Sequence, residues 1–162
     1  MIRRRWWSVG MVGILMIAGA VAGCSGDGDH NEGHHASGGC VLVGEREPNG
    51  TVFTAQFLGD LIVDECFVVA GSLFNPTDVD IYRVLIQESL NLVVTLDHSP
   101  LVDFDIQLFD ADTGRLILDC GRNLVPEVCV VHFAVRSRDI AVDIVVTSVV
   151  GAGTYTLTLD AQ

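Results

Sequence analysis

The chain has 162 residues and a formal net charge of −12, from 21 acidic residues against nine arginines and no lysine. A chain this acidic does not hold nucleic acid phosphates by charge, but it does attract divalent cations. With 49% hydrophobic residues it can bury the core of one domain of ordinary size, and a second domain does not fit.

The first 24 residues, "MIRRRWWSVGMVGILMIAGAVAGC", combine three arginines, an apolar run and small residues before Cys24. This order is typical of an export signal. The end "VAGC" resembles a bacterial lipoprotein box, which implies cleavage before Cys24 and acylation of that thiol, as with palmitate. A plain secretory signal or an N-terminal membrane anchor is the alternative. Removal of residues 1–23 takes away three arginines and no acid, so the mature net charge is −15.

Residues 24–40 hold the lipidated cysteine and then "SGDGDHNEGHHASGGC", which has no aliphatic residue larger than Ala36. This composition predicts a flexible tether. Its histidines, His30, His34 and His35, are compatible with a zinc or copper site. A solvated spacer is favoured, because ordering a flexible metal site costs conformational entropy. The folded domain is expected over residues 41–162.

From residue 41 onward, short apolar segments recur about every ten residues, separated by Gly, Pro, Asn and Asp. This spacing predicts an all-β protein, an antiparallel β-sandwich, and no stretch shows a convincing helical period. "DADTG", from Asp110 to Gly114, is expected to form a hairpin loop. The expected strands are residues 51–58, 66–73, 80–86, 91–97, 103–110, 115–120, 128–135, 140–148 and 154–160.

The predicted domain region holds four cysteines, and an even number in an exported protein predicts disulfides. Three pairings are possible. We favour Cys120 with Cys129 and Cys40 with Cys66, each contributing about 2 to 4 kcal/mol of stability. Zinc ligation by the four is the alternative, but C-x-x-C spacing is absent.

Catalytic motifs are missing from the sequence, which has no G-x-S-x-G, no H-E-x-x-H and no phosphate-binding glycine loop. His98 and His132 are the only histidines of the predicted domain, and we interpret both as structural rather than as general bases. Tyr155 alternates with core leucines, so it is interpreted as a packing residue. The sequence therefore predicts a protein that is not an enzyme.

The stretch "EREPNG" places Glu45, Glu47 and Asn49 at alternate positions. In an extended chain alternate side chains point to the same side, so these oxygens can converge on a hard cation. The alternative is that the acids are solvated turn charges.

Six motifs in order, "EREPNGTVFTAQ", "VVAGSL", "TDVDIYRVLI", "NLVVTLD", "VDFDIQLFDADTG" and "GAGTYTLTLD", resemble the bacterial pre-peptidase C-terminal (PPC) domain. The resemblance implies a small jelly-roll-like β-sandwich. Some members, including collagen-binding modules of secreted collagenases, bind calcium. For this chain the resemblance implies calcium ligands at Glu45, Glu47, Asn49, Asp78 and Asp80. Those members carry an acid after the asparagine, where this chain has Gly50.

The family's collagen contacts rely on exposed aromatic residues that are not matched here, so collagen is not an expected partner. We expect a non-catalytic, lipid-anchored β-sandwich of the cell envelope that binds a protein or polymer. In a cell with two membranes, Ser25 after the lipidated Cys24 favours sorting to the outer membrane. A purely structural envelope lipoprotein or assembly subunit is the alternative. Apolar loop residues, Leu101, Val102, Leu124 and Val125, are candidate contact points, and packing against the domain itself is the commoner alternative.

Overall fold

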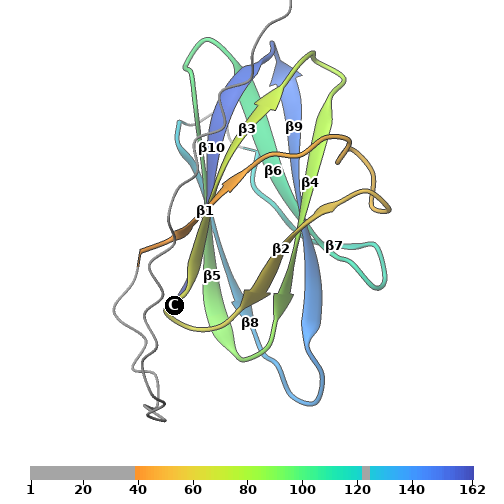
Figure 1. Cartoon of the computed structure of the whole chain (residues 1–162), viewed down its shortest axis with the longest axis vertical. Coiled ribbons are helices and arrows are strands. Elements are labelled where there is room, and N and C mark those ends of the chain that lie inside the picture. Colours follow the sequence, from red (N-terminus) through yellow and green to blue (C-terminus); the bar gives the residue numbers. More distant parts are fainter. Residues whose placement is uncertain (1–38, 122–124) are drawn as a thin grey trace, which may run out of the picture. The chain divides into compact units, whose positions relative to one another are not determined.

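A computed structural model describes residues 39–121 and 125–162, which form ten strands in two five-stranded sheets packed face to face (Figure 1). The export signal, Cys24 and nearly all of the tether lie outside the described residues, so those predictions stay predictions. In the part of the chain that the structure describes, no helix is long and apolar enough to cross a membrane. The predicted all-β sandwich is confirmed.

Each of the two sheets contains strands from both the N-terminal and the C-terminal half of the domain. The first sheet has the order β1 (Val41–Gly44), β3 (Cys66–Leu73), β10 (Gly153–Ala161), β5 (Leu90–His98) and β8 (Glu127–Phe133). The second has the order β2 (Gln56–Leu61), β4 (Val79–Ile86), β9 (Ile140–Val150), β6 (Asp103–Asp110) and β7 (Arg115–Asp119).

Most strand pairs are antiparallel, but β1 pairs with β3 and β2 pairs with β4 in parallel. The sheets are therefore mixed, which the sequence did not predict. The physical reason is that the chain crosses between sheets after β1 instead of returning in a hairpin.

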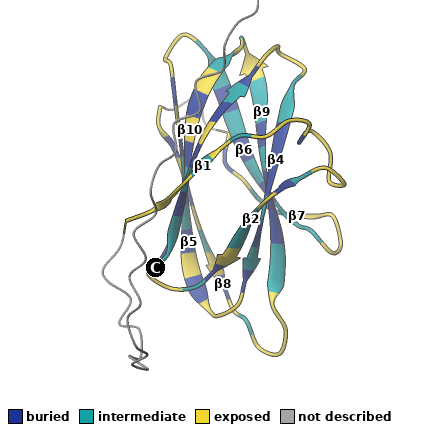
Figure 2. Ribbon diagram, viewed as in Figure 1, coloured by how far each residue is buried: buried dark blue, intermediate teal, exposed yellow. Residues whose placement is uncertain are grey.

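Strict alternation places the core between the sheets (Figure 2). Leu92, Val94 and Leu96 of β5 are fully buried, and so are Leu157 and Leu159 of β10. Each such side chain contributes about 1.5 to 3 kcal/mol relative to exposure. The strands predicted over residues 91–97 and 154–160 are confirmed, and so are the core leucines that alternate with Tyr155.

The strand predicted over residues 51–58 begins later in the structure than predicted. Residues 51–54 form a turn, in which Thr54 N donates to Thr51 O at 2.9 Å, and β2 begins only at Gln56. Strand β1 was not predicted, because it has four residues, Leu42 is 81% exposed, and no burial pattern marks it.

Two disulfides join the pairs of cysteines preferred from the sequence. The bond between Cys40 and Cys66 ties the start of β1 to β3, and the bond between Cys120 and Cys129 ties the chain after β7 to β8. The predicted hairpin loop from Asp110 to Gly114 also forms. Asp110 Oδ1 accepts from Thr113 N at 2.9 Å, and Gly114 has a φ of 67°.

Candidate metal centre

The segment of residues 45–49 carries the chain from the first sheet to the second, as the orange stretch after β1 shows in Figure 1. At its start Glu45 N donates to Ala70 O of β3 at 3.1 Å. At its end Asn49 O accepts from Ile81 N of β4 at 3.1 Å. We call residues 45–49 the crossing segment. It is the place where a single bound group can hold both sheets together.

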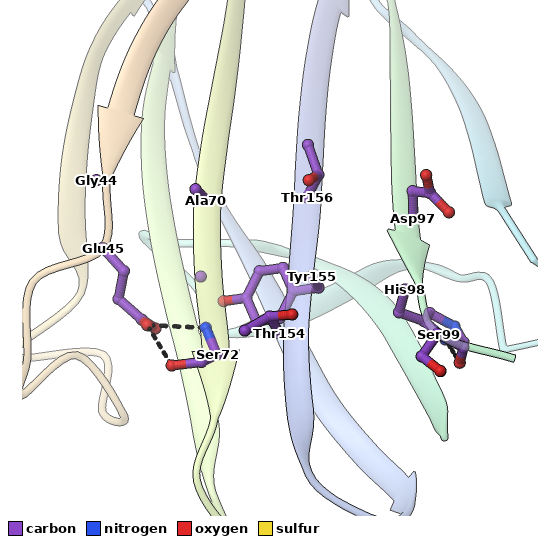
Figure 3. Close-up of a pocket in the computed structure, with 11 residues that line it drawn as sticks. Gly44, Glu45, Ala70, Ser72, Asp97, His98, Ser99, Thr154, Tyr155 and Thr156 are labelled. Atoms are coloured by element: carbon purple, nitrogen blue, oxygen red, sulfur yellow. Dashed lines mark hydrogen bonds between the residues drawn. The ribbon is translucent and has the colours of Figure 1, made fainter. Parts of the chain in front are cut away.

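Three carboxylates converge at the crossing segment. Glu45, Glu47 and Asp80 each offer an oxygen, and these oxygens all lie within 4.8 Å of one another. Glu45 Oε2 accepts from Ser72 N at 2.9 Å and from the Ser72 hydroxyl, which fixes its side chain against β3 (Figure 3). Glu47 Oε2 accepts from Asn49 N at 2.9 Å. The predicted alternation of the two glutamates thus places both in one cluster.

Two buried oxygens at the cluster have no hydrogen-bond partner among the described residues: Oδ1 of Asn49 and Oδ1 of Asp80. Both side chains are fully buried. The Asn49 Nδ2 atom donates to Glu45 Oε1 at 3.4 Å, which leaves the amide oxygen as the open acceptor. A buried acceptor without a donor costs about 1 to 3 kcal/mol, and a hard cation would satisfy both oxygens. The donor set therefore fits a cation that binds oxygen.

Two tyrosines connect the cluster to the interior. Tyr155 of β10 donates to Asp80 Oδ2 at 2.5 Å, and its oxygen lies 2.6 Å from the hydroxyl of Tyr82. Tyr82 in turn donates to Glu45 Oε1 at 3.2 Å. The Tyr155 ring passes over Gly71, where a Cβ atom would lie 2.4 Å from Cζ of the ring. Tyr155 is therefore a packing residue, as predicted, and also orients the carboxylate of Asp80.

Burial makes the ionised form of Asp80 unfavourable. The pKa of Asp80 rises to about 8, first because burial desolvates the carboxylate, and then because the neighbouring carboxylates of Glu45 and Asp78 disfavour another negative charge; the hydrogen bond from Tyr155 opposes this rise. Burial also raises the pKa values of Tyr82 and Tyr155, so both phenols stay protonated donors. Among the described residues no arginine forms an ion pair with the three clustered carboxylates. A cation would supply the missing positive charge.

Asp78, the fifth predicted ligand, lies outside the three-carboxylate cluster. Its carboxylate accepts from Phe74 N at 2.7 Å and from Val79 N at 3.1 Å, so it shapes the turn between β3 and β4. Sequence reasoning missed Gln56, whose amide accepts from Arg46 N at 2.7 Å and donates to Gly44 O at 3.0 Å. A single polar residue in an apolar strand gave no signal of this role.

The other candidates from the sequence lie apart from the cluster. His98 is buried at the end of β5, where its Nδ1 lies 3.0 Å from Ser99 O and its ring packs against Phe104. His132 is exposed on β8. Leu101 is 88% exposed and Val125 44% exposed, whereas Val102 is partly buried against the core and Leu124 lies outside the described residues.

The described residues are similar in structure to several solved proteins. The PPC domain of a collagenase from Bacillus anthracis superposes with a TM-score of 0.51 at 15% identity, over 73% of this chain and all of that chain. PliG, a periplasmic inhibitor of g-type lysozyme, gives TM-scores of 0.49 for the Aeromonas hydrophila protein and 0.46 for the Salmonella Typhimurium protein. Each is 11% identical over 67% of this chain, with 99% and 100% of its own chain covered.

No protein-family model matches the sequence, and no curated protein sequence does. The chain thus has the fold of a PPC domain, as the order of its motifs predicted. The similarity concerns the fold, and an activity has to be argued from the site.

Proposed function

We propose that this protein is a non-catalytic, calcium-clamped binding module of the bacterial cell envelope. The observation that carries the proposal is the meeting of three carboxylates with two buried, unpartnered oxygens at the crossing segment. The ion has a structural role here: it neutralises the carboxylates and holds the two sheets together where the chain passes between them.

Calcium suits this donor set better than the common alternatives. It takes six to eight oxygen ligands in flexible geometry, and Glu45, Glu47, Asp80 and the amide oxygen of Asn49 supply up to seven if each carboxylate binds through both oxygens. Magnesium demands a near-ideal octahedron, and zinc prefers nitrogen and sulfur. The described residues place no histidine or cysteine in the cluster.

The envelope location rests on the sequence and on the disulfides. The export signal with its lipoprotein-like end at Cys24 supports an anchor in a membrane, and two disulfides support an oxidising compartment. Labelling cells with radioactive palmitate tests the anchor. We expect label on the wild-type protein and none on Cys24→Ala; equal labelling of both would contradict the anchor.

We call the proposed calcium ion with its ligands at the crossing segment the clamp. It is tested on residues 25–162, which are exported so that the disulfides form. Thermal unfolding is followed in EDTA, in calcium and in magnesium. A ligand that binds only the folded state raises the melting midpoint with its concentration. We expect calcium to raise the midpoint far more than magnesium does. An unchanged midpoint up to millimolar calcium would contradict the clamp.

A further inference from the structure

The outer face of the second sheet carries an exposed, uncharged patch, which we call the aromatic patch: Val52, Phe53 and Phe57. Their exposures are 51%, 96% and 54%. Residues 48–59 contain no charged side chain at all, in a chain that is otherwise strongly acidic. A side chain as exposed as Phe53 gains nothing from the core of its own domain, so its exposure points to a contact with another molecule.

The patch rests on a fixed support. Arg83 of β4 is the register partner of Phe57, and its Nη2 donates to Val52 O at 3.2 Å. The guanidinium also binds both carboxylate oxygens of Asp143 on β9, at 2.6 and 2.8 Å. Because the ion pair and the turn at residues 51–54 hold the loop, Phe53 is presented without a large cost in ordering.

A group of acids lies on β6 and β7, two and more strands away from the patch, and oxygens of two of its members, Asp103 and Asp105, also lie within 4.8 Å of the buried Glu127 of β8 in the first sheet. We call it the acidic patch: Asp103 and Asp105 of β6 with Asp119 of β7. Gln107 lies between them, on the same face as Asp105, and donates to Asp119 Oδ2 at 3.3 Å. Partial burial raises the pKa of Asp105, and the charges of Asp103 and Asp119 raise it further. These like charges favour a cationic group from outside.

The two patches fit within one interface. Strands β2 and β6 are separated by β4 and β9 in the sheet, which amounts to about 14 Å across the strands. Phe57 is level with Phe109 of β6, four residues or about 13 Å along the strand from Asp105, so the two patches are about 19 Å apart. A standard protein interface buries about 800 Å² on each partner and spans more than this distance. One partner can therefore touch both patches at once.

Charge decides which partner fits. Residues 39–162 hold 18 acids and six arginines, a net charge of −12, so a second copy of this chain or an anionic lipid surface is repelled. The tether, residues 25–38, has no apolar side chain larger than alanine with which to cover Phe53. A basic protein can offer both an apolar side chain to the aromatic patch and positive charges to the acidic patch.

We propose that the outer face of the second sheet docks a basic protein, which seats an apolar side chain on the aromatic patch and sets arginine or lysine side chains against the acidic patch. This docking surface deepens the proposed binding role and rests on it. The clamp and the docking surface use different residues, so each can fail without the other.

The test measures binding of three synthetic peptides to residues 25–162 by fluorescence anisotropy in calcium. The first peptide has a central Leu-Trp-Leu between arginines, the second has Ser-Gly-Ser between the same arginines, and the third has Leu-Trp-Leu between glutamates. We expect the first to bind at least about tenfold more tightly than either of the others.

Matched variants assign the surface. Phe53→Ser with Phe57→Ser should weaken the first peptide about tenfold, whereas Phe74→Ser, which removes a 72% exposed phenylalanine from the β3–β4 loop, should not. Asp105→Asn with Asp119→Asn should also weaken it, unlike Asp97→Asn with Asp139→Asn. Melting curves verify that each variant is folded.

Three outcomes would overturn the docking proposal. Equal binding of the first two peptides would mean that only non-specific charge attraction acts. If none of the peptides binds, the face does not bind basic, apolar peptides. Binding to phosphatidylcholine vesicles that needs Phe53 would make a bilayer the occupant. Calcium stabilisation without peptide binding refutes the docking surface alone; peptide binding without calcium stabilisation refutes the clamp alone.

Discussion

Replacing Asp80 with asparagine isolates the role of the bound cation. The change keeps the size of the side chain and an oxygen that accepts from Tyr155, but it removes one of three carboxylates that lie within 4.8 Å of one another. At an effective dielectric constant near 20, two unit charges at this separation interact by about 3.5 kcal/mol. That energy is the repulsion between two ionised carboxylates.

The consequences differ with and without calcium. Because the pKa of Asp80 rises to about 8, the ion-free protein holds it protonated at pH 7, and asparagine resembles that form. In EDTA the midpoint of Asp80→Asn should therefore stay within about 2 °C of wild type. The lost attraction to a doubly charged ion, at the shorter distance of a coordinating oxygen, exceeds the relieved repulsion, so calcium affinity should fall more than 100-fold.

At calcium 100 times the wild-type dissociation constant, the wild type gains about 2.7 kcal/mol, or roughly 10 °C in a domain of this size. The variant at the same calcium should gain about 0.4 kcal/mol, or about 2 °C. Differential scanning calorimetry measures all four midpoints, and Asp139→Asn, which removes an exposed carboxylate, serves as control. An equal calcium response in Asp80→Asn and wild type would refute the reasoning.

Three further predictions follow from the same contacts. The folded pKa of Asp80, about 8, exceeds its unfolded value near 4, so its contribution to ion-free stability is full below about pH 4 and is lost as pH rises through 8. Calcium must displace that proton, so the affinity measured by calorimetric titration should rise about tenfold per pH unit from pH 6 to 8 and then level off; a flat profile contradicts this. Tyr155→Phe removes the donor to Asp80 and should cost about 1 to 3 kcal/mol in urea unfolding, whereas a cost near zero would mean that the hydrogen bond is not made. Gly71→Ala drives a methyl group to within 2.4 Å of the Tyr155 ring and should cost about 1 to 3 kcal/mol or more, in contrast to Gly44→Ala, where nothing lies within 4 Å.

The sequence predicted those parts of the fold that have strong local patterns. Strands such as β5 and β10 alternate strictly between core and surface, so their existence and their inward residues could be read directly. Strand β1 could not, because an exposed four-residue edge strand is defined by its pairing with β3 and by the disulfide at Cys40 rather than by its own composition.

The candidate metal centre was also predictable only in part, namely where local spacing or the family resemblance carried a signal. Spacing placed Glu45 and Glu47 on one side of an extended segment, and family resemblance added Asp80 from a strand of the other sheet. Strand alternation does not separate Asp78 from Asp80, which are two residues apart. Asp78 stays out of the cluster because it lies in the turn before β4, where its carboxylate accepts from Phe74 N and Val79 N. The hydrogen bonds of Tyr155 and Gln56 bring together residues far apart in sequence, for which local spacing carries no signal.

The most direct test of the central claim is a crystal structure of residues 25–162 grown in calcium, with anomalous data to locate the ion. The account predicts one calcium at the crossing segment, 2.3 to 2.6 Å from oxygens of Glu45, Glu47, Asp80 and Asn49 Oδ1. A site without anomalous signal at millimolar calcium, with Asn49 Oδ1 bound to water instead, would contradict it.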